Sequence, residues 1–309
     1  MDTIFIDINC DVGEGTGLET ELMPLISSCN IACGGHAGNL DTIAEVARSA
    51  KENGVKVGAH PSYPDTENFG RVSMSISEFD LTKSIRRQID DFASILKKEN
   101  IPFNHIKAHG ALYNDIAKDS DLAKIFVKSI EGYQDIASIY VPYGSAIEAE
   151  ALQRGFQVKY EGFADRNYNR NLSLVSRKLP EAVITDPEKV LKHLLQMVRE
   201  KYIATIDGLK IYSKAETFCV HGDTPSVVQI LNYLSLELPK LKIQIKNCCL
   251  TPYLSDLWNS CCFGGMAERG RRGHIRRYSA ILPIPKNTLS KRERLGDDTC
   301  LQFTYSCSE

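Results

Sequence analysis

The feature that most constrains this chain is a regular alternation of short apolar runs with amphipathic segments over residues 1–246. β-Branched runs of period two alternate with stretches that carry apolar residues at helical spacing. The pattern predicts strands at 4–8, 28–32, 55–59, 106–108, 136–141, 157–160 and 218–220, and helices at 41–53, 75–100 (opened by a capping box of Ser75 and Glu78), 120–130, 146–154, 186–201 and 225–238. Seven such units, or eight if 242–245 is also a strand, predict an α/β fold whose parallel sheet closes into a TIM-like β/α barrel.

Residues 247–309 differ in composition from the rest of the chain. They hold six of the ten cysteines, and nine Lys or Arg against six Asp or Glu, which leaves 28 against 33 for residues 1–246. The segment shows neither helical nor strand periodicity. We therefore expect a catalytic barrel at 1–246 and a basic, cysteine-rich C-terminal extension at 247–309 that is poorly ordered or derived from a shifted reading frame.

Charge and hydropathy exclude several classes of partner. The formal net charge of -2 provides no basic field for nucleic acid. No apolar run approaches the roughly 20 residues of a membrane span, and the N-terminus lacks a signal-peptide pattern, so we expect a cytoplasmic protein. The cysteines of the barrel region lack paired CxxC spacing, which indicates reduced thiols and no cysteine metal site: Cys10, Cys29, Cys33 and Cys219.

Polar side chains collect where the predicted strands end, which is where parallel barrels carry their chemistry. In the first strand, the period of two places Asp7, Asn9 and Asp11 on one face. The candidate residues in the later strands or after the strand ends are Glu14, Asn30, His36, His60, Lys107, His109, Tyr113, Glu161, Asp165, Arg166, His221 and Asp223.

A lysine inside a barrel strand needs a partner, because a buried ammonium is costly to desolvate. We expect Lys107 to pair with Asp11 or Glu161, and Arg166 to offer its guanidinium to a carboxylate. His105 and His193, by contrast, lie where a surface position is expected.

No known nucleotide or hydrolase motif decides the chemistry. A Walker segment, a dinucleotide fingerprint and a GxSxG elbow are all lacking, and Cys33 beside Gly34 is a weak nucleophile candidate. Histidines and carboxylates at barrel strand ends fit either metal-assisted hydrolysis or acid–base handling of an amide. Spacing alone leaves both open.

Six motifs in order resemble one family. They are DINCDVGE at 7–14, NIACGGHAG at 30–38, GAHP at 58–61, KAHGALYN at 107–114, FADR at 163–166 and VHGDTP at 220–225. They are similar to the LamB/YcsF family, the A subunits of bacterial-type 5-oxoprolinases. The resemblance implies a seven-stranded barrel related to the polysaccharide deacetylase (NodB-like) barrels. It also implies ATP-dependent opening of 5-oxo-L-proline to L-glutamate together with B and C subunits, with Mg²⁺ accompanying ATP and no tightly bound cofactor.

The sequence departs from the family pattern at three positions. The family usually has an aromatic residue where Gly35 stands, an aspartate at Asn39 and a proline at Ala108. We interpret these as changes of fit more than of chemistry.

The resemblance also implies roles for the candidate residues. Asp11 and His109 would move protons, and His36 with His60 would stabilise charge on the reacting oxygen. Lys107 and Arg166 would bind phosphate or the substrate carboxylate. The remaining candidates would bind substrate, with Asp7 and Asp223 as second choices: Asp7, Asn9, Glu14, Asn30, Tyr113, Glu161, Asp165, His221 and Asp223.

Two alternatives belong to other functional classes. A stand-alone metal-dependent deacylase would use Asp11, His36 and His60 as ligands and would need no ATP. A non-catalytic scaffold or carbohydrate-binding regulator would tolerate the loss of Lys107 or Asp11.

Overall fold

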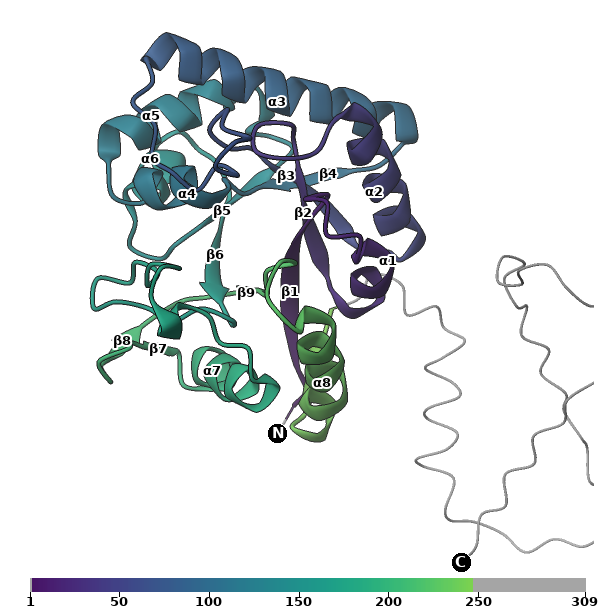
Figure 1. The fold of residues 1–309 in the computed structure, drawn as a ribbon, viewed down its shortest axis with the longest axis vertical. Coiled ribbons are helices and arrows are strands. Elements are labelled where there is room, and N and C mark those ends of the chain that lie inside the picture. The colour runs from purple at the N-terminus through teal and green to yellow at the C-terminus, as the bar shows by residue number, and fades with distance from the viewer. Residues whose placement is uncertain (1, 247–309) are drawn as a thin grey trace, which may run out of the picture. The chain divides into compact units, whose positions relative to one another are not determined.

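Parallel strands close into a barrel with helices around it (Figure 1). Seven strands form the ring, and an eighth pairs with the first. The computed structural model describes residues 2–246, so the predicted extension at 247–309 lies outside the described residues. The barrel strands are β1 (Ile4–Val12), β2 (Ser28–Ala32), β3 (Lys56–His60), β4 (Phe103–Ile106), β5 (Ser138–Val141), β6 (Val158–Phe163) and β9 (Thr217–Cys219).

The length of β1 explains how the barrel closes. Its residues 7–9 pair with β9 and its residues 9–12 pair with β2, which completes the ring. Its first residues, 4–6, pair with β10 (Ile243–Ile245). The structure thus confirms the predicted seven-stranded barrel and places the optional eighth strand outside the ring.

Helices lie around the barrel and connect its strands (Figure 1). They are α1 (Glu19–Leu22), α2 (Leu40–Glu52), α3 (Glu78–Glu99), α4 (Gly110–Ile116), α5 (Ser120–Ser129), α6 (Ala146–Gln153), α7 (Pro187–Arg199) and α8 (Val227–Lys240), with short 3₁₀ turns at Met23–Leu25, Glu131–Tyr133 and Pro180–Ala182. The side chains of Asn39, Ser77 and Asp186 accept backbone N–H groups at the starts of α2, α3 and α7. These polar caps fix where the long helices begin.

Short elements are where the sequence-based prediction was incomplete. It missed the antiparallel hairpin of β7 (Tyr202–Ala204) and β8 (Lys210–Tyr212), and also helix α4. The fourth strand ends at Ile106, so Lys107 and Ala108 follow the strand instead of lying within it. The three-residue strands and the seven-residue helix carry too few residues to show a clear period, which explains these omissions.

The inside of the barrel is polar, while the outer face of β1 is apolar. Asp7, Asn9 and Asp11 are at most 5% exposed, and the residues between them belong to the hydrophobic core under the helices. The predicted alternation of β1 is therefore confirmed.

The surface positions expected for His105 and His193 were wrong, since both side chains are buried. His105 Nε2 lies 2.7 Å from Asn30 Oδ1, and the imidazole stacks on the Tyr140 ring. Gly58 makes room for it, because a Cβ there would lie 2.1 Å from His105 Nε2. His193 packs on the inner face of α7 beside Tyr168.

Among the described helices, none is long and apolar enough to cross a membrane.

Candidate active site

A buried ion-pair cluster centred on Lys107 forms the floor of the site. Lys107 Nζ lies 2.9 Å from Asp11 Oδ1 and 3.0 Å from Glu161 Oε1, and all three side chains are at most 5% exposed. The structure thus confirms both partners expected for this lysine. Burial alone would lower the pKa of Lys107, but the neighbouring carboxylates outweigh it and hold the pKa well above its usual range. Lys107 is a fixed positive charge.

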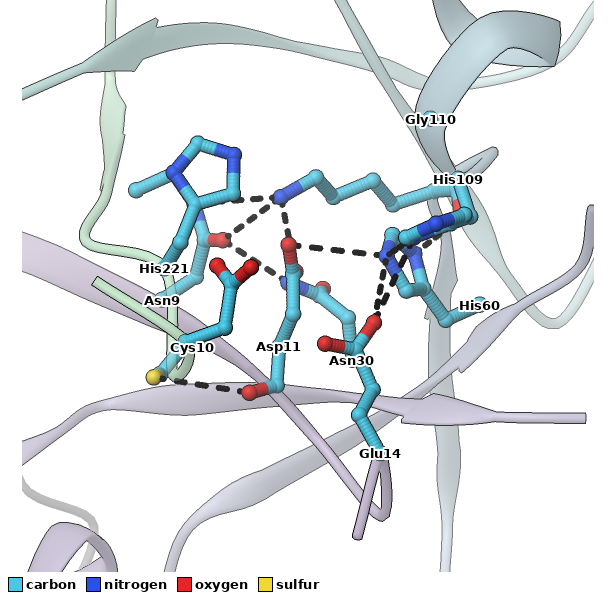
Figure 2. Close-up of polar contacts among 12 residues, drawn as sticks. Asn9, Cys10, Asp11, Glu14, Asn30, His60, His109, Gly110 and His221 are labelled. Atoms are coloured by element: carbon cyan, nitrogen blue, oxygen red, sulfur yellow. Dashed lines mark hydrogen bonds and ion pairs between the residues drawn. The ribbon is translucent and has the colours of Figure 1, made fainter. Parts of the chain in front are cut away.

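Asp11 is the residue on which the cluster converges. Figure 2 shows it between His60 on one side and His221 on the other. Its Oδ1 also accepts a hydrogen bond from Asn30 Nδ2 at 2.7 Å, and its Oδ2 lies 3.5 Å from His60 Nε2. Burial would raise the pKa of Asp11, but His60 and Lys107 hold it well below its usual range, so this carboxylate is ionised.

Deeper in the barrel than Asp11, the buried polar side chains form hydrogen bonds with one another. Asn30 Nδ2 also donates to Asn9 Oδ1 at 2.8 Å, and Asn9 donates to Thr217 Oγ1 at 2.8 Å. Asp7 lies one layer deeper, where Thr217 donates to its Oδ1 and Lys159 lies 3.0 Å from its Oδ2. Asn9 and Asn30 support Asp11 from beneath, whereas Asp7 does not line the cavity.

Three histidines and Glu14 meet beside Asp11. Glu14 Oε1 lies 3.0 Å from His36 Nε2, 3.3 Å from His109 Nδ1 and 3.9 Å from His60 Nε2. The rings of His36 and His109 stack with centroids 3.5 Å apart. Burial lowers the pKa of His109 to about 4 and also lowers that of His36, although the bond from Glu14 opposes both shifts.

The hydrogen-bond pattern of His60 and His109 is unusual. His60 Nδ1 lies 2.8 Å from the backbone oxygen of Lys107, and His109 Nε2 lies 3.0 Å from that of Phe69. Because a carbonyl only accepts, both of these nitrogens carry hydrogen. The other two nitrogens face each other at 3.0 Å, so a proton or a cation must lie between them or between them and Glu14.

Glu161 and Tyr113 hold polar atoms that the described protein groups leave without hydrogen bonds. Neither oxygen of the Glu161 carboxylate accepts a hydrogen bond of normal geometry within residues 2–246, although Lys107 makes an ion pair with Oε1. Tyr113 Oη, close to Glu161, likewise makes no hydrogen bond of normal geometry there. Burial and the nearby Glu161 raise the pKa of Tyr113 well above its usual range. A buried polar atom without a partner is costly, so these groups are suited to a bound ligand.

The site opens into a cavity of about 440 Å³, within the range of roughly 300–1,000 Å³ typical of small-molecule sites. The structure brings nine of the predicted residues to its lining: Asp11, Glu14, His60, Lys107, His109, Tyr113, Arg166, His221 and Asp223. Glu161 lines an adjoining cavity of about 90 Å³ that shares Tyr113 and Phe163 with the first. His36 lies behind His109.

Asp165 positions the loop that follows β9. It accepts the backbone N–H of His221 at 2.9 Å and lies 3.0 Å from His221 Nδ1. Burial would raise the pKa of Asp165, but the contacts with His221 and Thr224 lower it. The charged carboxylate therefore orients His221 toward the cavity that it lines.

Arg166 lies at the cavity but does not present a free guanidinium. Its Nε donates to the Ala182 carbonyl at 3.1 Å and its Nη2 to the Val175 carbonyl at 2.7 Å. Sequence reasoning missed two other arginines, Arg71 and Arg177, which line the cavity mouth and both contact Asp223. They lie in irregular loops, far along the chain from the ends of β3 and β6, so no periodic pattern marked them.

Cys33 lacks the properties of a nucleophile. It is a buried free thiol whose pKa burial raises to about 12. The other three cysteines of residues 2–246 are likewise free and buried, as the composition predicted.

The metal triad expected from the sequence differs from the groupings in the structure. Within residues 2–246, the sets whose ligand atoms all lie within 4.8 Å of one another are Glu14, His36 and His109, and Asp11, Cys219 and His221. The predicted set of Asp11, His36 and His60 is not among them, because Asp11 pairs with Lys107 while His36 pairs with Glu14.

Comparison with known proteins decides the family, since residues 6–251 match the family described as LamB/YcsF. The chain belongs to the LamB/YcsF family. A relative from Thermus thermophilus, named as the A subunit of 5-oxoprolinase, is 35% identical over 246 residues, covering 78% of this chain and 98% of the relative. A second, of the same name, from Pyrococcus furiosus, is 38% identical over 245 residues, covering 78% of this chain and 96% of the relative.

A solved structure of similar fold supports the same assignment. The crystal structure described as a lactam utilization protein from Thermus thermophilus has a TM-score of 0.72 and 34% identity to this chain. It matches over 79% of this chain and 100% of its own length. That structure and this chain therefore share the barrel described above.

Gly35, where the resemblance led us to expect an aromatic residue, is closely surrounded in the structure. A Cβ at Gly35 would lie 2.4 Å from Ser62 Oγ and 2.5 Å from Gln88 Oε1, so these side chains fill the space. Gln88 is buried there and bonds to both the backbone N–H and the carbonyl of Ser62. Asn39 accepts the Thr42 N–H at 2.9 Å, the capping bond that an aspartate would also make.

Proposed function

We propose that this chain is the A subunit of an ATP-dependent 5-oxoprolinase and opens the lactam of 5-oxo-L-proline to give L-glutamate. The observation that carries the proposal is the ionised Asp11 held between Lys107 and His60 at the floor of a cavity of about 440 Å³. The names of the relatives, which refer to 5-oxoprolinase and to lactam utilization, support the choice of a cyclic amide as substrate.

A five-membered lactam resists attack by water, because amide resonance makes its carbonyl carbon a poor electrophile. ATP would supply the activation by phosphorylating the amide oxygen, which turns that oxygen into a leaving group. Water then adds to the carbon, the ring C–N bond breaks, the nitrogen gains a proton, and phosphate leaves when a second water completes the carboxylate. The balanced products are glutamate, ADP and phosphate.

His60 is the group best placed to move a proton. Its Nδ1–H is held by the Lys107 carbonyl, so Nε2 faces Asp11 and Glu14 as the exchangeable position. The Lys107 carbonyl fixes the orientation of this imidazole, and the Asp11 carboxylate lies beside the nitrogen that exchanges the proton. In this proposal His60 moves the proton that the resemblance assigned to Asp11, and His109 relays it, since its Nδ1 lies 3.0 Å from His60 Nε2.

Lys107 and Glu161 would act on the lactam from the other side of Asp11. The Lys107 ammonium is already shared by Asp11, Glu161 and the Cys219 sulfur at 3.2 Å, so it contributes a fixed field to the developing oxyanion instead of a free binding arm. The Glu161 oxygens, which lack hydrogen bonds within the described part of the chain, suit the lactam N–H as an acceptor.

The relatives are named as one lettered component of an enzyme, which supports assembly with further subunits. We propose that B and C subunits complete the enzyme and that Mg²⁺ accompanies ATP. We also propose a cytoplasmic location, which the buried free thiols support, because free thiols persist in reducing compartments.

Glutamate release from 5-oxo-L-proline tests this proposal. The chain mixed with its B and C subunits should form glutamate and ADP in equal amounts, and omission of ATP should abolish both. Glutamate formation that continues without ATP, or ATP hydrolysis that does not respond to 5-oxo-L-proline, would contradict the proposal.

A metal-dependent hydrolase is the second candidate, and one observation favours it. The facing nitrogens of His60 and His109, together with Glu14 and His36, form a set of lone pairs suited to a divalent ion. The buried charges also leave room for a cation. Three carboxylates face the single ammonium of Lys107, and each of their side chains is at most 5% exposed: Asp11, Glu14 and Glu161. When bound, such an ion would lower the pKa of a water molecule.

Metal analysis of the purified protein separates the two candidates. If the chain is a metal hydrolase, the purified protein should contain about one divalent ion per chain, and the Glu14→Gln variant should lose it. The isolated chain should also cleave amides, and a chelator should stop this cleavage. Metal-free protein that supports ATP-dependent turnover in the reconstituted complex would exclude it.

A further inference from the structure

Three loops from different barrel strands meet at the mouth of the cavity. Arg71 follows β3, Arg177 follows β6 and Asp223 follows β9. Arg177 Nη1 and Nη2 donate to the two Asp223 oxygens at 3.2 Å each, and Arg71 Nη2 contacts Asp223 Oδ2. All three side chains remain partly exposed, between 22% and 37%, and all three line the cavity.

The charges at this mouth do not balance. Two guanidinium groups share a single carboxylate, and Lys178 adds a further cation to the same lining. A paired, fork-like contact of this kind is the geometry with which arginine binds carboxylates and phosphates. Asp223 thus stands where an anionic ligand group would bind.

Arg177, and not Arg166, presents its guanidinium to the cavity mouth. Arg166 is held within its own loop, since its Nε and Nη2 donate to the carbonyls of Ala182 and Val175. Val175 lies two residues before Arg177, and its N–H in turn donates to the Asn167 carbonyl at 2.9 Å. Arg166 therefore positions the segment that carries Arg177.

The mouth is physically connected to the proposed proton-moving groups. The Arg71 guanidinium lies 4.7 Å from the centre of the Phe69 ring, and the Phe69 carbonyl bonds to His109 Nε2. A second connection runs through Gly222, which precedes Asp223 and packs so closely on β1 that a Cβ there would lie 2.3 Å from the Asp11 backbone oxygen. An anion held at the mouth would therefore be fixed relative to both His109 and Asp11.

We propose that Arg71 and Arg177 form the anion-binding site of this protein, and that Asp223 occupies it until an incoming carboxylate or phosphate group displaces it. The identity of the molecule that carries the anion rests on the proposed function: it is either the carboxylate of the lactam or a phosphate of the nucleotide. The arginine pair itself does not depend on that choice.

Titration calorimetry on the full chain tests the proposal without any turnover. The probes are inorganic phosphate, ATP, 5-oxo-L-proline and its neutral carboxamide. Wild type should bind at least one of the anionic probes, and the carboxamide should bind more weakly than 5-oxo-L-proline if the lactam carboxylate is the anion. If phosphate and ATP bind, and 5-oxo-L-proline and its carboxamide bind with equal affinity, the anion held by the two arginines is a phosphate group.

The variants Arg71→Gln and Arg177→Gln should each weaken binding of that probe by about 10-fold or more, as expected for the loss of a charge-assisted bond. Arg170→Gln is the matched control, because Arg170 lies in the same loop as Arg177 but is 74% exposed and pairs with Asp207 outside this cavity. It should bind as wild type does.

Asp223→Asn distinguishes the proposal from a purely structural ion pair. If the carboxylate competes with the ligand, its removal should tighten anion binding, by roughly 3-fold or more. If Asp223 only holds the loops together, its removal should weaken binding. Weaker binding in Asp223→Asn, unchanged binding in both arginine variants, or no saturable binding of any anionic probe to wild type would overturn the proposal. Phosphate binding that depends on the two arginines, without lactam cleavage, would overturn only the proposed function.

Discussion

Replacing Lys107 by methionine should strongly destabilise the barrel, because it leaves two buried carboxylates without their cation. Methionine preserves much of the length and volume of the side chain, so the perturbation is mainly electrostatic. Lys107 Nζ lies 2.9 Å from Asp11 and 3.0 Å from Glu161. At an effective dielectric constant near 20, one contact of this length corresponds to about 6 kcal/mol of Coulomb energy.

Two effects reduce the net cost. Folding of the variant no longer removes an ammonium group from water, which returns several kcal/mol to the free energy of unfolding. A stranded carboxylate can also take up a proton, which costs about 4 kcal/mol at pH 7 for a group of ordinary pKa. We therefore expect Lys107→Met to lower the free energy of unfolding by about 4 kcal/mol at pH 7, in line with other broken buried pairs.

The pH dependence of this loss provides an internal check. In wild type the pKa of Asp11 lies well below its usual value, so its stabilising contribution is present at neutral pH and is lost as pH falls through that pKa. In the variant Asp11 lacks the Lys107 charge, so protonation becomes easier and the difference from wild type should shrink between pH 7 and pH 5.

Urea unfolding followed by circular dichroism measures these differences. Lys128→Met is the matched control, since Lys128 pairs with Glu78 at 3.4 Å while both side chains are more than half exposed. It should change stability by less than about 1 kcal/mol. The double variant Lys107→Met, Glu161→Gln should be more stable than Lys107→Met alone. A Lys107→Met protein within about 1 kcal/mol of wild type at pH 7 would refute the reasoning.

Two further predictions concern stability away from the ion-pair cluster. Burial lowers the pKa of His193 from 6.5 to about 4, so as the pH falls this histidine is protonated in the unfolded chain before it is protonated in the folded one. This difference should lower the free energy of unfolding of wild type by about 2 kcal/mol between pH 7 and pH 5. Urea unfolding of His193→Leu at both pH values should show a loss smaller by that amount, and equal losses would contradict burial as the cause. Gly222→Ala puts a Cβ 2.3 Å from the Asp11 backbone oxygen and should cost about 1–3 kcal/mol, whereas Gly132→Ala, with no atom within 4 Å, should cost much less. Comparable melting temperatures of the two glycine variants would show that the loop after β9 can move away from β1.

Much of the barrel was predictable because its longer elements repeat a clear period. The alternation of Asp7, Asn9 and Asp11 with apolar residues in β1 correctly predicted a polar inner face. The need of a buried lysine for a counter-charge correctly predicted the partners of Lys107. Both inferences depend on local sequence and on the energetics of burial.

What the sequence did not reveal depends on contacts between distant segments. His105 is buried because Asn30 and Tyr140, from other strands, complete its surroundings. Arg166 donates hydrogen bonds within its own loop. Arg71 and Arg177 both contact Asp223, although their two loops are more than 100 residues apart in the chain. No local pattern marks such convergence, because loop geometry is set by the packing of the whole barrel.

The central claim is that chemistry occurs at the layer of Asp11 and not at the deeper layer of Asp7. Both aspartates lie on the inner face of β1 and both are buried, so Asp11→Asn and Asp7→Asn form a matched pair. The measurement is kcat/KM for glutamate formation from 5-oxo-L-proline in the complex with B and C subunits, with folding of each variant verified by circular dichroism. Asp11→Asn should lose about 100-fold or more, as expected when a proton-transfer pair is broken, and folded Asp7→Asn should stay within about 10-fold of wild type. Wild-type turnover in Asp11→Asn would contradict the account.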